Sequence, residues 1–220
     1  YNDIVVETNC LPLHDFKRVF LFSWVVQTCH CLGLTQYLSL FTRSRFGIGF
    51  RAFYERLLEF AEQNPQTILG REFQQVSDIV DAAVEGGSWG MVVPRFGKII
   101  WPTEEASFLS MVCDKDRFYA QISQFLRYLL SDVGATLDDE QLNGLLCYQR
   151  NMIIDPFTPP TLTFDIDYDF HEYFEAAHLG TSRELRKRAT RLTTTPEQTF
   201  QGDLELYART IVWYGRKANK

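Results

Sequence analysis

Three aspartates at alternate positions have the type and spacing that most directly suggest chemistry. Asp165, Asp167 and Asp169 form a D-x-D-x-D pattern, and carboxylates spaced in this way can bind a divalent cation. An EF-hand calcium loop also needs glycine at its sixth position and an acid at its twelfth, where this chain has Phe170 and Ala176. A metal-dependent transferase that uses the first two aspartates stays open. The alternation in TLTFDIDY favours the other interpretation, a strand whose aspartates face water.

A second group of potential ligands is the run Cys29-His30-Cys31, with Cys10 or His14 as a further donor. Neighbouring residues on a helix point about 100° apart, so this run cannot converge on one ion unless the helix unwinds. We therefore expect buried structural thiols and no metal site. The chain's cysteines have no disulfide-like spacing, which predicts reduced thiols in a cytoplasmic protein: Cys10, Cys29, Cys31, Cys113 and Cys147.

A basic cluster consists of Arg183, Arg186, Lys187, Arg188 and Arg191, with a single acid among them. We consider these residues candidates for contact with a partner or with another part of the chain, although a strand edge protected by charge explains them as well. The net charge of −6 gives no reason to expect nucleic-acid binding. The sequence contains no G-x-S-x-G, H-E-x-x-H, C-x3-C-x2-C or glycine-rich phosphate loop, so we assign no catalytic, cofactor-binding or metal residue.

The element that must position these groups is the stretch from Val19 to Thr42, which has no charged side chain. Its length would suit a membrane span, but about a third of its residues are polar, and polar groups are costly in hydrocarbon. We therefore expect a long central helix that is buried all round in a soluble domain, kinked or split at Gly33. Helical spacing places two polar lines on it: Ser23, Gln27 and His30 on one, and Thr28, Thr35, Ser39 and Thr42 on the other.

The remaining pattern predicts a mainly α fold, with a small β-hairpin near 89–101 and a small α+β unit at the C-terminus. Apolar residues at helical spacing predict helices over 50–63, about 115–133 and 138–152. A strand over 161–168, a short helix, an extended basic segment and a last helix near 203–215 follow. The loop IIDPFTPP divides the chain into a mainly helical domain, 1–152, and an α+β unit, 161–220.

Several of these segments together resemble the C-terminal region of cobalamin-dependent radical S-adenosylmethionine (SAM) enzymes. They are LPLHDFKRVFLFSWVVQTCHCLGLTQYLSLF, FRAFYERLLEFA, PTLTFDIDYDFHEYFEA and LELYARTIVWYGRK, in the same order and over nearly the entire chain. In that family a cobalamin-binding domain precedes a partial barrel, whose C-x3-C-x2-C motif holds the [4Fe-4S] cluster that cleaves SAM. The present chain has neither the motif nor the cobalamin domain.

The resemblance implies an accessory domain that packs beside the barrel, helps to shape the substrate site and is not catalytic alone. Its partner would be the remainder of its own polypeptide, which would carry the cluster, SAM and cobalamin. The polar line Ser23, Gln27 and His30 suits a substrate-lining role, although hydrogen bonds within the domain explain it too. We expect the chain to be a piece of a longer polypeptide, since it begins at Tyr1 within a strand-like segment. The alternative is a self-contained helical interaction or sensor domain.

Overall fold

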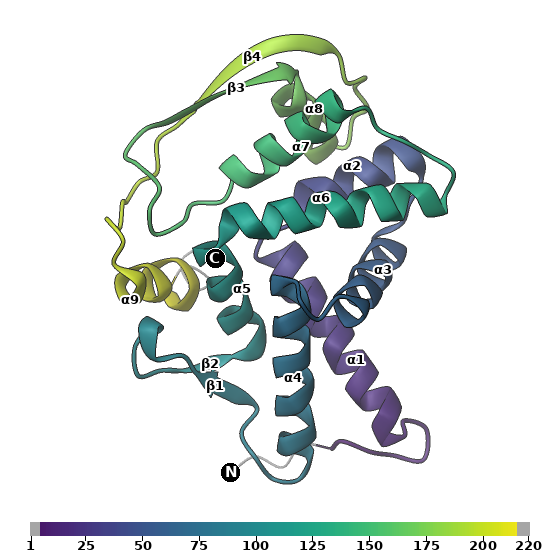
Figure 1. Ribbon diagram of the computed structural model, residues 1–220, viewed down its shortest axis with the longest axis vertical. Coiled ribbons are helices and arrows are strands. Elements are labelled where there is room, and N and C mark those ends of the chain that lie inside the picture. The colour runs from purple at the N-terminus through teal and green to yellow at the C-terminus, as the bar shows by residue number, and fades with distance from the viewer. Residues whose placement is uncertain (1–4, 215–220) are drawn as a thin grey trace.

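The computed structural model describes residues 5–214, so the last residues of the predicted C-terminal unit, 215–220, lie outside the described part. The described chain is mainly helical with two small antiparallel sheets, which confirms the predicted fold class. Helix α6 crosses the middle of the molecule in Figure 1, with α3, α4 and α5 below it and α7, α8 and the β3–β4 ribbon above it. Within residues 5–214, no helix is both long enough and apolar enough to cross a membrane.

The longer helices carry most of the core. Their bounds are α1 Leu13–Val26, α2 Gln36–Phe46, α3 Phe50–Gln63, α4 Ile68–Val84, α5 Thr103–Cys113, α6 Lys115–Asp132, α7 Asp139–Asn151 and α8 Phe170–His178. A π-helical turn, Gln27–Cys31, continues α1, and a second one, Ala208–Tyr214, continues the short α9, Leu204–Tyr207. The strands are β1 Gly90–Val92, β2 Ile100–Pro102, β3 Leu162–Tyr168 and β4 Lys187–Thr194, and a 3-10 turn, Pro94–Phe96, lies between the first two.

The long uncharged stretch forms two helices instead of one, and they separate where the sequence predicted a break. Gly33 has a φ of 93°, a left-handed conformation that glycine adopts without steric cost. The buried side chain of Gln149, on α7, bridges the break, because it donates to the Gly33 carbonyl and accepts from the Tyr37 N–H, both at 2.9 Å. This bridge satisfies backbone groups that the interrupted helix leaves without partners.

The prediction that the stretch is buried all round is wrong for α1. Trp24 and Val25 are fully buried, but Val19 is 58% exposed. Helix α1 contacts α3, α4 and α5 along one side, and its other side remains open. An aromatic contact between helices distant in sequence shows where the core lies: the rings of Phe53, on α3, and Phe125, on α6, are edge to face with centroids 5.3 Å apart.

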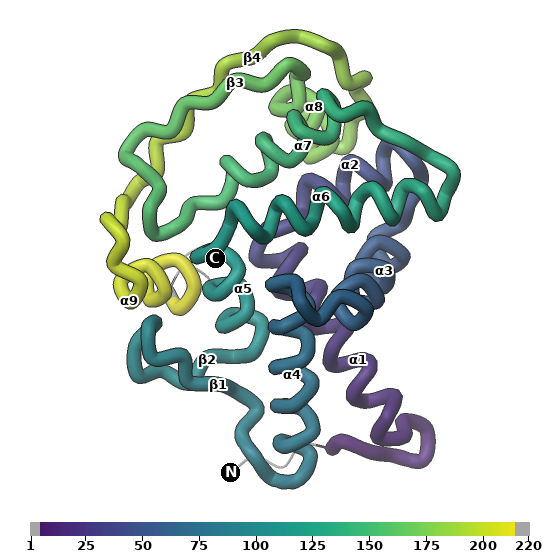
Figure 2. The backbone as a smooth tube through the Cα atoms, in the orientation of Figure 1, coloured from purple at the N-terminus to yellow at the C-terminus, as the bar shows by residue number. Residues whose placement is uncertain are grey.

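The C-terminal segments return to the helical part at two places. Helix α8 packs on α2 and α7, with the ring of Phe174 4.8 Å from that of Tyr37 and 5.3 Å from that of Tyr148. Helix α9 lies beside the β1–β2 hairpin and α5, far from the ribbon that precedes it (Figure 2), and there Trp213 meets Trp101 at 5.7 Å between ring centroids. One hydrophobic core therefore extends across the loop that follows α7.

Candidate functional site

A hydrogen-bonded cluster around His30 joins the π-helical turn to α2 and α3. The Nδ1 atom of His30 lies 2.9 Å from the hydroxyl of Tyr54 and 3.3 Å from that of Ser39. The Tyr54 hydroxyl also lies 3.2 Å from the Ser39 hydroxyl and 3.3 Å from that of Thr35. π-helical turns are rare and occur frequently at functional sites. Here the turn places an imidazole at the end of a chain of hydroxyl groups.

The protons of this cluster can be assigned from the acceptors that surround it. Thr35 donates to the Cys29 carbonyl at 3.1 Å, and Ser39 donates to the Gln36 carbonyl at 2.8 Å. Each hydroxyl has one proton, so neither can also donate to Tyr54. The two shorter contacts, at 2.9 and 3.2 Å, both have a donor when His30 Nδ1–H donates to Tyr54 and Tyr54 donates to Ser39. We assign this tautomer from the network, and it leaves the Nε2 of His30 as a hydrogen-bond acceptor.

A hollow of about 330 Å³ lies beside this imidazole. Phe22 and Val26 from α1 and Phe50, Arg51 and Tyr54 from α3 line it together with His30. Burial lowers the pKa of His30, which keeps the ring neutral at physiological pH, and burial raises the pKa of the Tyr54 phenol, which keeps it protonated. The hollow is thus a mainly apolar space whose wall also contains the neutral His30 and Tyr54 and the charged Arg51.

Of the predicted polar line Ser23, Gln27 and His30, only His30 lines this hollow. Gln27 donates to the Ser23 hydroxyl at 3.1 Å, and Ser23 is exposed on the surface. The wider π-helical turn aligns His30 with Phe22 and Val26 instead of with the two polar residues. The line was derived from regular α-helical spacing, and sequence spacing gives no warning of the irregular turn.

A larger groove of about 870 Å³ runs between α1 and α3 and continues from the His30 hollow, since Phe22 and Arg51 line both. Its apolar lining includes the exposed Val19 and the half-buried Leu58. Charged groups of opposite sign also line it: Lys17, Arg18 and Arg51 are basic, and Glu55, Glu59 and Glu62 are acidic. We call this the α1–α3 groove. An apolar groove with charged groups of both signs is typical of a surface that contacts another protein segment.

A second polar cluster, which the sequence did not predict, surrounds Lys115 at the start of α6. Its ammonium group pairs with Asp155 and donates to the Ile153 carbonyl at 3.0 Å. The two charged side chains are only 9% and 13% exposed. A nearby pair between Arg150 and Asp116 lies on the surface. The Lys115 cluster and the Arg150–Asp116 pair together line a polar hollow of about 350 Å³.

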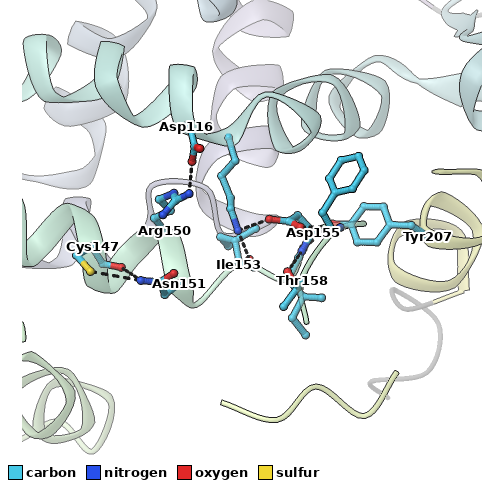
Figure 3. A network of polar contacts seen from close by, with 11 residues as sticks. Asp116, Cys147, Arg150, Asn151, Ile153, Asp155, Thr158 and Tyr207 are labelled. Atoms are coloured by element: carbon cyan, nitrogen blue, oxygen red, sulfur yellow. Dashed lines mark hydrogen bonds and ion pairs between the residues drawn. The ribbon is translucent and has the colours of Figure 1, made fainter. Parts of the chain in front are cut away.

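This cluster fixes the loop between α7 and β3. Asp155 accepts from the Phe157 N–H at 2.8 Å, and its own N–H donates to Thr158 at 2.9 Å. The hydroxyl of Tyr207 reaches the loop from α9 and donates to the Ile154 carbonyl at 2.7 Å. Figure 3 shows Tyr207 beside Asp155 of this loop. The loop therefore connects α6 with the C-terminal helical segment. Because the cluster joins this loop to α6 and to the C-terminal helical segment, we assign it a structural role.

Most of the basic cluster forms ion pairs within the chain. Lys187 contacts Glu140 at 2.6 Å, Arg191 contacts Asp165 at 2.8 Å, and Arg183 and Arg188 both pair with Glu172. Arg186 contributes its backbone, whose N–H donates to Asp169 at 2.8 Å. These groups remain largely exposed, so the contact with a partner stays a prediction.

The three aspartates have different environments, so the prediction that all face water is wrong for Asp169. Asp165 and Asp167 are exposed on β3, and the guanidinium of Arg191 holds the pKa of Asp165 below its usual value. Asp169 is 1% exposed, because it lies where β3 meets α8 and accepts the backbone N–H of Arg186. Among residues 5–214, no three acidic, histidine or cysteine side chains are grouped so that they could hold a metal ion.

The prediction of buried thiols is correct for only part of the cysteine–histidine run. Cys29 is buried, and burial raises the pKa of its thiol, so it stays protonated. Cys31 and Cys10 are exposed, which corrects the expectation for them. The reason is that Cys31 lies at the end of the π-helical turn, just before the chain bends at Gly33.

Comparison with known proteins relates the chain to methyltransferases. It is 26% identical to 2-(S-pantetheinyl)-carbapenam-3-carboxylate methyltransferase of Streptantibioticus cattleyicolor, over 96% of this chain and 33% of that protein. It is 27% identical to the cobalamin-dependent radical SAM methyltransferase TokK of Streptomyces tokunonensis, over 82% of this chain and 28% of that protein. No family model matches. The chain thus spans about a third of the length of these curated relatives and resembles one region of cobalamin-dependent radical SAM methyltransferases.

Proposed function

We propose that this chain is a C-terminal accessory region of a cobalamin-dependent radical SAM methyltransferase. It packs beside the radical SAM barrel of the same polypeptide and helps to shape the substrate site, and it is not catalytic alone. The similarity to two such relatives over most of this chain, but only about a third of theirs, supports this proposal. The cysteines, which we interpret as reduced, are consistent with an enzyme of the cytoplasm.

The donor set of this chain does not fit an iron–sulfur cluster. Such a cluster needs thiolates that converge on it, and C-x3-C-x2-C is missing from the sequence. The Cys29 thiol is buried and protonated, and Cys31 is exposed. We therefore assign the cluster, SAM and cobalamin to the rest of the polypeptide and derive no step through them here.

The observation that carries the proposal is the α1–α3 groove. Helix α1 leaves Val19 58% exposed on a groove that also has apolar side chains from α3 and α4. Isolated exposed apolar residues are ordinary, but a groove to which three helices contribute apolar side chains indicates a contact surface. The barrel would cover this groove and the adjoining His30 hollow, and the substrate would then lie near the junction.

The test uses the full-length polypeptide that contains this chain, whose coding sequence should include C-x3-C-x2-C. Val19→Arg places a charge in the groove, so we expect methyl transfer to fall by roughly tenfold or more, as for a buried unpaired charge. Val133→Arg is the matched control, since Val133 is 52% exposed at the end of α6, outside the groove. Activity that is equal in the two variants would contradict the assignment of the groove, and a reading frame without the cluster motif would contradict the proposed function.

A further inference from the structure

The hollow beside His30 differs from an ordinary surface depression in the polar group that its wall offers. The Tyr54 and Ser39 hydroxyls approach His30 at Nδ1. Within residues 5–214 no hydrogen bond is made to Nε2, and the imidazole also lines the hollow. A neutral imidazole whose Nδ1 carries the proton presents a lone pair at Nε2.

The charges around the hollow indicate what kind of ligand it accepts. Arg51 lines it, but its guanidinium pairs with Glu55 at 2.9 Å, so the local charge is balanced. Phe22, Val26 and Phe50 supply an apolar surface. A small ligand pocket has this composition, mostly apolar with few polar groups that set orientation, and about 330 Å³ is within the usual range of volumes.

We infer that this hollow is a binding site for a small neutral apolar group that carries one N–H or O–H donor, with Nε2 of His30 as the acceptor. The relay through Tyr54 and Ser39 fixes the imidazole tautomer, so Nε2 accepts and does not donate. Tyr54 is thus a positioning residue, because it acts on the ligand through His30. The inference goes beyond the proposed function, since it names the kind of ligand that a site built from this chain's own residues accepts.

The experiment compares two probes on the 220-residue chain, phenol and anisole, which share an aromatic ring but differ in the hydroxyl donor. Binding is followed through the ring nitrogen signals of ¹⁵N-labelled histidine. We expect phenol to bind at millimolar concentration, to shift the His30 signals and to bind roughly tenfold more tightly than anisole, as one neutral hydrogen bond would provide. In the free protein, the same spectra should show Nδ1 protonated.

Two variants separate the acceptor from the shape of the hollow. Tyr54→Phe keeps the ring but removes the hydroxyl that accepts from Nδ1–H, so the tautomer is no longer fixed and the preference for phenol should fall toward unity. Ser23→Ala changes an exposed side chain outside the lining and should leave the preference unchanged. Far-ultraviolet circular dichroism of both variants establishes that they are folded.

Several results would overturn the inference. They are no binding of phenol, binding without a shift of the His30 signals, equal affinity for the two probes, or an unchanged preference in folded Tyr54→Phe. None of them bears on the proposed function, which depends on the α1–α3 groove and on activity of the full-length polypeptide. Loss of activity in Val19→Arg with no phenol binding would support the accessory role and reject the ligand site.

Discussion

The clusters around Lys115 and His30 both hold polar groups between helices, but they differ in whether those groups have all found partners. Lys115 and Asp155 bind each other and the backbone of one loop. His30 has partners at Nδ1, and its imidazole lines an open hollow. A buried charge must be paired, whereas a neutral ring nitrogen can remain available for a ligand. The first cluster therefore stabilises the fold, and the second is suited to binding.

The largest effect that this comparison predicts is at Lys115. Lys115→Met leaves Asp155 buried without its counter-charge, so we expect the free energy of unfolding to fall by about 3–5 kcal/mol. Urea unfolding followed by circular dichroism measures this change. Lys187→Met is the matched control, because the Lys187–Glu140 pair is exposed and its removal should cost much less stability than Lys115→Met does.

A second variant distinguishes the lost pair from lost packing. Lys115→Met combined with Asp155→Asn removes both charges and should recover part of the stability, since no uncompensated carboxylate remains. If Lys115→Met and Lys187→Met were equally stable, the Lys115 cluster would not have the structural role that we assign to it.

A smaller effect is expected at His30, and it depends on pH. Burial lowers the pKa of His30 below its value of 6.5 in an unfolded chain, so the unfolded state binds the proton more readily. The resulting stability is present at neutral pH and is lost as the pH falls through 6.5 toward the folded-state pKa. Because the ring is only half-buried, we expect this contribution to be below about 1 kcal/mol.

Urea unfolding of the wild type and of His30→Gln at about pH 7.5 and about pH 5 tests this effect. The wild type should lose more stability between the two conditions than the variant does, because glutamine does not titrate. A loss of the same size in both proteins would mean that the His30 environment is as polar as water, and the contrast with the Lys115 cluster would then disappear.

The smallest effect is expected in the basic cluster, which is paired but exposed. Arg191→Ala removes an ion pair with Asp165 whose two side chains are 72% and 66% exposed, so we expect a smaller change in stability than at Lys115 or His30. Thermal unfolding of the 220-residue chain measures this. In the full-length polypeptide, a loss of activity in Arg191→Ala without a loss of stability would support the predicted partner contact, and unchanged activity would argue against it.

The amino-acid sequence by itself determined the elements whose pattern is local. The spacing of Phe53, Tyr54 and Leu57 predicted α3 at its observed bounds, and the alternation in TLTFDIDY predicted β3. The break near Gly33 was also predictable, because only glycine adopts its left-handed backbone readily. These features depend on interactions between near neighbours in the chain, which the sequence displays directly.

Only the tertiary structure decided how the polar groups are paired. His30 and Tyr54 belong to different helices, and Asp155 reaches Lys115 only because the loop after α7 folds back onto the start of α6. Because of the π-helical turn, His30 does not align with Ser23 and Gln27. Asp169 does not face water, because it is buried at the start of α8. Hydrophobic periodicity specifies which side of an element faces inward, but partners that are distant in sequence depend on how the elements pack.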